Sequence, residues 1–218
     1  MMSDIEGVSA SFNLETYLQA RKLAQKIMLL TASQVDVGMT EEDGIKIIDQ
    51  LCDNFGIEKK WHPHKFRIGI NTTKSFREKS EPNVKLKDND IYFIDIGPVI
   101  NGHEADIGQT FTIGQTPEYS LCQKTSRDIF NEVKEVWKDK GISGEELYRK
   151  AESIADSKGF ILNTKMKGHR LGDFPHALYY KGGLIDFDKK PIENLWVLEI
   201  LIQDKSGQFG AFYEDILY

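Results

Sequence analysis

The sequence predicts an α+β fold in which helices back a curved, largely antiparallel sheet that two related halves share. Two stretches with helical apolar spacing open the chain, and β-rich runs that end in a hairpin follow them. The same order of elements then occurs again in the second half, although no sequence repeat is detectable. No linker or low-complexity segment separates the halves, so we expect one domain over residues 1–218.

Four helices are predicted from apolar periodicity and from signals at their ends. Thr40 with Asp43, and Ser143 with Glu146, have the spacing of a capping box, and Pro117 suits a first helical position. The predicted helices cover residues 14–33, 40–56, 116–141 and 143–158.

Two hairpins are predicted from β-rich runs on either side of turn signals. Asn101-Gly102, a strong two-residue turn signal, separates the runs 91–100 and 105–114. The second hairpin pairs residues 195–203 with 208–218 around the turn DKSG, and a short strand at 160–163 precedes it.

Composition favours a soluble protein that does not bind nucleic acid or membranes. The chain is 40% apolar and 28% charged, and its net charge of −6 comes without a dense stripe of Lys and Arg. No secretory signal and no apolar run of about 20 residues is present, so we expect a cytoplasmic protein. Cys52 and Cys122 form no CxxC motif, and we expect buried free thiols in a reducing compartment.

The first hairpin carries two acids where strands disfavour them. Asp95 and Asp106 are each flanked by apolar residues, and a buried carboxylate must be paired or bound to a cation. If Asn101-Gly102 is the turn, Asp95 lies opposite Gly108, and Asp106 is its diagonal neighbour on the same face. A register shift of one residue would put the two acids on opposite faces.

The second hairpin places two glutamates face to face. A turn centred between Ser206 and Gly207 sets Glu199 directly opposite Glu214. Two buried glutamates in that position repel each other unless a cation lies between them. This pair is the strongest purely physical indication of a metal site in the sequence.

Two imidazoles lie between the hairpins, at His169 and His176 in the segment GHRLGDFPHA. Four carboxylates and one imidazole suit two divalent ions such as Mn²⁺, Co²⁺, Fe²⁺ or Zn²⁺. Two such ions at about 3.5–4 Å share a water, lower its pKa and polarise a carbonyl. A lone Asp in a strand is more often solvent-facing, so the prediction depends on all five residues together.

These residues resemble the pita-bread metallopeptidases, a family of methionine aminopeptidases, proline-specific aminopeptidases and dipeptidases, and creatinase. The likeness runs from about Tyr17 to the C-terminus and is carried by the motifs IDIGPVINGHEADIGQT, GHRLGDFPH, VLEI and YEDI. The resemblance implies a pseudo-twofold pita-bread fold and a binuclear metal site. It implies that Asp106 and Glu214 bridge both ions, that Asp95 completes one ion, and that His169 and Glu199 complete the other.

The resemblance also implies roles in catalysis. A hydroxide that bridges the ions would attack the scissile carbonyl, and Glu199 would accept the proton and pass it to the leaving amine. His176 would contact the substrate carbonyl or the tetrahedral intermediate. The expected function is a binuclear metal-dependent exopeptidase acting on short peptides, with Xaa-Pro substrates favoured and a homodimer allowed. A creatinase-like C–N hydrolase and a catalytically impaired binding module remain alternatives.

The sequence departs from the family pattern near the substrate. The family usually has a histidine upstream of the first Asp, and counting back eighteen residues gives Arg77. His62 and His64 could reach the site from a neighbouring strand, and we assign His64 to substrate binding. Arg170 replaces a usual glycine and could pair with a substrate carboxylate, although an outward-facing Arg170 is as well supported. Trp61 is expected to pack in the core or against a hairpin, and Glu104 is expected on the surface.

Overall fold

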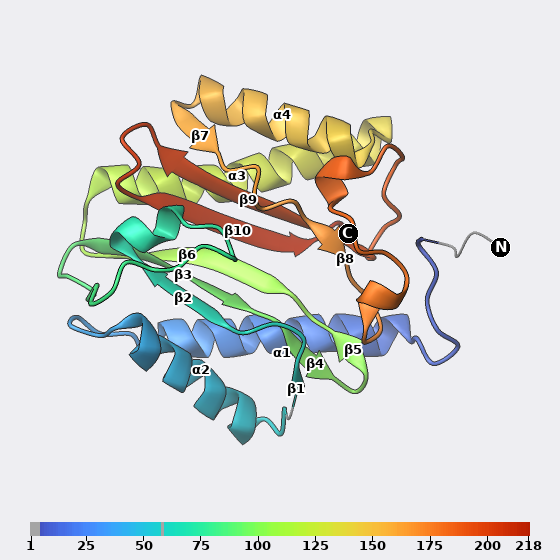
Figure 1. The fold of residues 1–218 in the computed structure, drawn as a ribbon, viewed down its shortest axis with the longest axis horizontal. Coiled ribbons are helices and arrows are strands. Elements are labelled where there is room, and N and C mark those ends of the chain that lie inside the picture. The colour runs from blue at the N-terminus through green and yellow to red at the C-terminus, as the bar shows by residue number, and fades with distance from the viewer. Residues whose placement is uncertain (1–4, 58) are drawn as a thin grey trace.

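The predicted helices and hairpins occur in the predicted order, in a computed structural model that describes residues 5–57 and 59–218 (Figure 1). The helices are α1 (Leu14–Ala32), α2 (Glu41–Asn54), α3 (Pro117–Lys140) and α4 (Gly144–Ser157), with short 3-10 helices at Gly69–Thr73, His176–Leu178 and Leu184–Asp186. The strands are β1 (Lys59–Lys60), β2 (Lys65–Ile68), β3 (Asp90–Ile96), β4 (Pro98–Ile100), β5 (His103–Glu104), β6 (Ile107–Ile113), β7 (Phe160–Leu162), β8 (His169–Arg170), β9 (Trp196–Asp204) and β10 (Gly210–Ile216).

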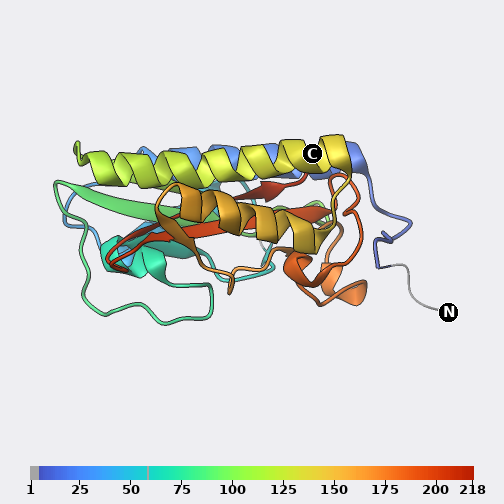
Figure 2. The same ribbon diagram turned by 90° about the horizontal axis from the view of Figure 1, so that it is seen from above.

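The main sheet is antiparallel and joins the two halves of the chain. Within the described ranges it has seven strands in the order β2-β3-β6-β10-β9-β7, with β8 paired to β9. The halves meet where β6 pairs with β10. Figure 1 shows α1 and α2 beside the β2–β3–β6 half and α3 and α4 beside the β9–β10 half, while Figure 2 shows α1 and α3 on the same side of the sheet.

Most helix ends follow the predicted capping. Both predicted capping boxes are present, at Thr40 with Asp43 and at Ser143 with Glu146. Pro117 occupies the start of α3 as predicted, but the Thr116 hydroxyl makes no capping hydrogen bond. None of the helices in the described part of the chain combines the length and apolar character that a membrane span requires.

The predicted run 91–100 is divided into β3 and β4 at Gly97, and β4 joins a small separate sheet with β1 and β5. The turn itself is as predicted, because Ile100 pairs with His103 on either side of Asn101-Gly102. Asp95 pairs with Gly108, as that turn requires.

Side chains alternate along a strand, so one face of β3 packs in the hydrophobic core and the other faces the pocket. Tyr92, Ile94 and Ile96 point into the hydrophobic core that α1 and α2 cover. On the other face, Phe93 packs in a smaller cluster, and Asp95 lines a pocket. Both faces of this central strand are therefore buried, and one of them carries an acid.

The second half has its own core between the strands and α3 and α4. Val133, Trp137, Leu147, Trp196 and Leu198 belong to it and are at most 3% exposed. Cys122 also lies there and Cys52 lies in the first core, both as buried free thiols, as predicted.

Candidate metal centre

The two glutamates of the second hairpin lie opposite each other, as the turn position predicted. Glu199 on β9 pairs with Glu214 on β10, and Glu214 pairs on its other side with Gly108. Glu199 Oε2 accepts a hydrogen bond of 2.6 Å from the backbone N–H of Gly168. Glu214 is 2% exposed, and its Oε1 has no hydrogen-bond partner among the described residues.

Gly108 on β6 allows the acids of the two neighbouring strands to approach each other. It pairs with Asp95 on one side and with Glu214 on the other. A Cβ at Gly108 would lie 2.6 Å from Glu214 Oε1 and 2.5 Å from the ring of Phe212. Only a glycine therefore leaves room for the Glu214 carboxylate in this position.

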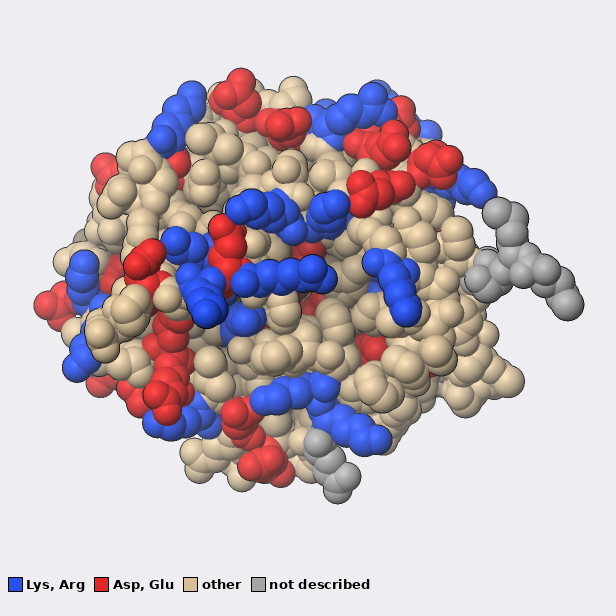
Figure 3. Space-filling view, in the orientation of Figure 1, with Lys and Arg blue, Asp and Glu red and all other residues tan. Residues whose placement is uncertain are grey.

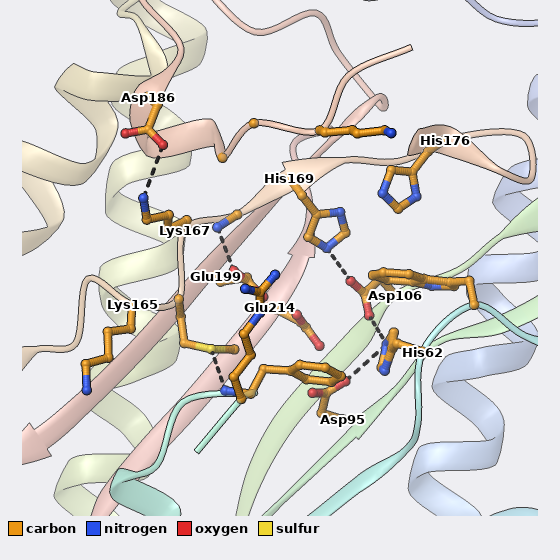
Figure 4. A pocket seen from close by; sticks show the side chains of 18 residues that line it. His62, Asp95, Asp106, Lys165, Lys167, His169, His176, Asp186, Glu199 and Glu214 are labelled. Atoms are coloured by element: carbon orange, nitrogen blue, oxygen red, sulfur yellow. Dashed lines mark hydrogen bonds and ion pairs between the residues drawn. The ribbon is translucent and has the colours of Figure 1, made fainter. Parts of the chain in front are cut away.

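Asp106 lies just before β6 and receives an imidazole on each of its oxygens. His169 Nε2 lies 2.8 Å from Oδ2, and His62 Nε2 lies 3.1 Å from Oδ1. His62 Nε2 is also 3.5 Å from Asp95 Oδ1. Figure 4 shows both imidazoles directed at Asp106 from opposite sides, with Asp95, Glu199 and Glu214 around the same cavity.

Burial makes the carboxyl groups difficult to ionise without a cation. Burial, assisted by the neighbouring acids, raises the pKa of Asp95 to about 7. The same causes raise the pKa of Glu199, and raise that of Glu214 well above its ordinary value. Ionising all four carboxyl groups together would therefore require more positive charge than the two imidazoles of the cluster supply.

Asp106 and its two imidazoles behave as ion pairs. Burial would raise the pKa of Asp106, but its hydrogen bonds to His169 and His62 outweigh burial and lower it. For the two histidines burial acts in the opposite direction and lowers the pKa. The neighbouring acids outweigh burial and raise the pKa of both His62 and His169 to about 9.

These donors fit a divalent metal. Asp95 Oδ1 and Glu214 Oε1 are buried without a hydrogen-bond partner among the described residues, which is expensive unless a cation satisfies them. Donor atoms of His62, Asp95 and Asp106 all lie within 4.8 Å of one another. Carboxylate oxygens mixed with imidazole nitrogens suit Mn²⁺, Fe²⁺, Co²⁺ or Zn²⁺.

His176 also lines the pocket, held from behind by Glu104. Its Nδ1 donates to Glu104 Oε2 at 2.5 Å, and its backbone N–H donates to Oε1 at 3.2 Å. Trp61 packs edge-on against both His169 and His176. Glu104 is 1% exposed, so the surface position expected for it is wrong. Trp61 packs against a hydrophobic cluster, as expected, and it also lines the pocket.

The pocket has a volume of about 550 Å³, with an acidic floor and a basic rim. Arg77, Lys165, Lys167 and Lys181 line it. Figure 3 shows Lys and Arg side chains gathered around the hollow in the middle of this face. Lys165 pairs with Glu78 at 2.9 Å and Lys167 with Asp186 at 3.3 Å. Within residues 5–57 and 59–218, the exposed Arg77 and Lys181 have no hydrogen bond or ion pair.

Arg170 does not line this pocket, which contradicts its assignment to substrate binding. Neighbouring residues on a strand point to opposite faces, so Arg170 on β8 points away from the site that His169 faces. Its guanidinium donates to the backbone oxygens of Leu171, Leu195 (3.1 Å) and Gly7 (2.5 Å). At 1% exposure it does not point outward into solvent either.

The assignment of His64 to substrate binding is also wrong. The chain bends at Trp61 and His62, so His64 points towards α2 and away from the pocket. Its Nε2 lies 3.7 Å from Cys52 Sγ, and burial lowers its pKa to about 4, as expected for a neutral packed imidazole. His62 occupies the site in its place.

Comparisons with known proteins agree on family and fold. The sequence model described as metallopeptidase family M24 matches residues 15–218. A methionine aminopeptidase of Buchnera aphidicola is 28% identical over 179 residues, which cover 73% of this chain and 64% of that protein. The chain thus spans less than two thirds of this curated relative.

Solved structures confirm the predicted pita-bread fold. The methionine aminopeptidase of Thermotoga maritima superposes with a TM-score of 0.75 at 14% identity, covering 100% of this chain and 99% of that chain. The prolidase of Pyrococcus horikoshii gives a TM-score of 0.76 at 18% identity, covering 98% of this chain and 61% of that chain.

Proposed function

Because the chain belongs to metallopeptidase family M24, we propose that it is a metal-dependent exopeptidase that releases N-terminal residues from short peptides. The observation that carries the proposal is the convergence of Asp95, Asp106, Glu199 and Glu214 in one pocket, with two buried oxygens that have no hydrogen-bond partner in the described part of the chain. A module that only binds partners has no need to confine four carboxylates at this cost. The intact cluster likewise disfavours a creatinase-like, metal-independent hydrolase.

We assign the metal ligands by their positions in the family motifs. Asp95, Asp106, His169, Glu199 and Glu214 would together hold the divalent ions. Such ions supply electrophilic polarisation of the scissile carbonyl and a water that is acidic enough to react near neutral pH.

The protein's own groups handle the proton and the substrate. Glu199 is suited to accept a proton from the attacking water and pass it to the leaving amine, because burial raises its pKa. Gly168 holds its Oε2 by a hydrogen bond, so Oε1 is the atom left for that proton. Glu104 engages Nδ1 of His176, which leaves Nε2 to contact the substrate carbonyl oxygen.

The substrate is proposed to be a short peptide with a free C-terminal carboxylate. A pocket of about 550 Å³ is in the range that holds a small ligand. Once cations neutralise the floor, the basic rim dominates the local field and favours an anionic group. Arg77 and Lys181 are the rim residues with no ion pair in the described structure. We therefore assign pairing with the substrate carboxylate to them instead of to Arg170. Xaa-Pro dipeptides are the first choice because prolidases and an X-Pro aminopeptidase share the fold.

The experiment is a peptidase assay of protein stripped of metal and reloaded separately with Mn²⁺, Co²⁺, Fe²⁺ or Zn²⁺. Ala-Pro, a longer Xaa-Pro peptide and a Met-initiated peptide are compared, with Asp106→Asn as the matched variant. We expect release of the N-terminal residue that requires metal and that Asp106→Asn abolishes. Hydrolysis that survives in Asp106→Asn, or the absence of hydrolysis with every metal, would reject the proposal.

A further inference from the structure

His62 and His169 contact Asp106 in the same way from opposite sides (Figure 4). Nδ1 of His169 lies 2.8 Å from the carbonyl oxygen of Arg170, the next residue, and Nδ1 of His62 lies 2.9 Å from that of Pro63, again the next residue. In both rings Nε2 is then directed at Asp106, at 2.8 Å for His169 and 3.1 Å for His62. His62 therefore has the arrangement of the proposed ligand His169.

This arrangement fixes which ring nitrogen can bind a cation. A carbonyl oxygen only accepts, so Nδ1 of each ring must carry a proton. In a neutral ring the lone pair then lies on Nε2 and faces a carboxylate oxygen, which is also an acceptor. A backbone partner on the second nitrogen is the usual support of a metal-bound histidine.

The distances around His62 suit two donors of one ion. Its Nε2 lies 3.1 Å from Asp106 Oδ1 and 3.5 Å from Asp95 Oδ1. Metal bonds of about 2.0–2.2 Å that meet at angles of about 90–110° place neighbouring donor atoms about 3–3.5 Å apart. The Asp95 Oδ1 atom is also one of the two buried carboxylate oxygens of the cluster that have no hydrogen-bond partner among the described residues.

The local structure holds His62 in this place. The backbone N–H of Trp61 donates to the Gly97 carbonyl at 2.9 Å, and its indole Nε1 donates to the Ala105 carbonyl at 3.0 Å. A Cβ on Gly97 would lie 2.2 Å from the His62 ring, so the glycine is needed for the ring to approach. The turn before β2 thus carries the imidazole to the carboxylates.

We propose that His62 is a sixth protein ligand of the metal centre and binds the ion that Asp95 completes. Each ion of the pair then has one imidazole, His62 on one and His169 on the other, with Asp106 between them. This inference rests on the metal centre of the proposed function, but it concerns a residue outside the five motif positions. It makes the centre richer in nitrogen and therefore better suited to Fe²⁺, Co²⁺ or Zn²⁺ than to Mg²⁺ or Ca²⁺.

The test counts coordinated imidazoles in the full-length protein loaded with Co²⁺. Each histidine bound through Nε2 gives a strongly shifted, solvent-exchangeable Nδ1–H resonance in the proton NMR spectrum of the paramagnetic protein. Metal analysis first establishes the Co²⁺ stoichiometry. The variants are His62→Ala, His62→Gln and His169→Ala, and His176→Ala is the matched control because it removes a pocket imidazole that Glu104 holds.

We expect two shifted N–H resonances in the unchanged protein and in His176→Ala, and one in His62→Ala, His62→Gln and His169→Ala. Loss of His62 should also weaken one Co²⁺ site by at least about 10-fold in a calorimetric titration. One resonance in the unchanged protein, a count that needs no variant to fold, would overturn the inference but leave the proposed function standing. If the unchanged protein binds no Co²⁺, both proposals are overturned.

Discussion

Glu104 fixes the ring of His176, although 72 positions separate the two residues. One carboxylate oxygen accepts from Nδ1 at 2.5 Å, and the other accepts from the backbone N–H at 3.2 Å. Glu104 is 1% exposed and has no direct part in the pocket lining, so it acts on the substrate only through His176.

Glu104→Gln should lower kcat by about 10-fold or more without changing the bound metal, because a charge-assisted hydrogen bond that orients His176 is lost. His176→Ala should lower kcat as well. If Glu104 acts only through His176, the double variant should be no slower than His176→Ala alone. The measurement is kcat and KM on Ala-Pro, with metal content as the control. Losses that multiply in the double variant would contradict this role.

The metal-free protein should lose stability as pH rises from about 6.5 to about 9. The folded-state pKa of His62 and of His169 is about 9, above the ordinary 6.5, so the folded state binds their protons more tightly. That contribution is fully present below pH 6.5 and is lost as pH rises through 9. Asp95, with a pKa of about 7 against an ordinary 3.8, acts in the same direction at lower pH.

Thermal unfolding with EDTA or with Co²⁺, measured across this pH range, tests the prediction. Metal competes with the same protons, so the rise in Tm on adding Co²⁺ should be largest at the alkaline end. Asp106→Asn removes the carboxylate that both imidazoles share, although Asp95 still faces His62, and should make the metal-free profile less steep between pH 6.5 and 9. A metal-free Tm that increases across that range would disagree with the ion pairs described.

Gly108→Ala should weaken metal binding even though the position carries no donor. The new methyl group would meet Glu214 Oε1 at 2.6 Å and the Phe212 ring at 2.5 Å, so one of them must move. We expect a loss of about 1–3 kcal/mol in the free energy of unfolding and at least a 10-fold weaker Co²⁺ site.

Gly207→Ala is the control for that variant. Gly207 lies in the turn of the second hairpin with φ +69° and nothing within 4 Å of a built Cβ. Its substitution should cost about 1 kcal/mol through backbone strain and leave Co²⁺ affinity unchanged. Equal effects of the two substitutions on Co²⁺ affinity would argue against a steric role for Gly108.

Arg77→Gln should affect substrate binding, whereas Arg170→Gln should affect the stability of the fold. Arg77 lies exposed on the pocket rim, so its loss should raise KM for Ala-Pro several-fold, leave Ala-Pro-amide almost unchanged and hardly alter Tm. Arg170 satisfies buried backbone carbonyls, so its loss should cost about 1–3 kcal/mol and lower Tm by about 2–4 °C for each kcal/mol. Lys79→Gln, an exposed change outside the pocket, is the control for charge. An unchanged preference for the free carboxylate in Arg77→Gln would refute its role.

The sequence predicted the parts of the site that depend on strand register. Opposing Glu199 and Glu214, and opposing Asp95 and Gly108, follow from turn positions alone because a hairpin turn determines every pair beyond it. The helix boundaries were likewise predictable from capping residues such as Thr40 and Ser143. These are local signals, and the fold preserves them.

Residues outside regular elements were predicted less well. His62 and His64 differ by two positions, and only the bend at residues 61–62 decides which one enters the pocket. Arg170 could have been excluded by strand alternation next to His169, but β8 is only two residues long and gives no periodic signal. Glu104 was missed because its partner His176 lies on a loop whose return to β5 no sequence spacing indicates. Its position in the second residue pair from the turn, in a hairpin with buried acids, was the available clue.

The pairing of β6 with β10 runs through Gln109 with Tyr213 and Gly108 with Glu214, where two separately packed cores adjoin. Asp95 and Asp106 come from one side of this seam, and His169, Glu199 and Glu214 come from the other. Ions bound there would add a further cross-link to the strand pairing, the Arg21–Asp215 ion pair and the apolar clusters that already join the two halves. The stability of the molecule and its chemistry would then depend in part on the same side chains, so a chelator should lower the unfolding temperature of the metal-loaded protein.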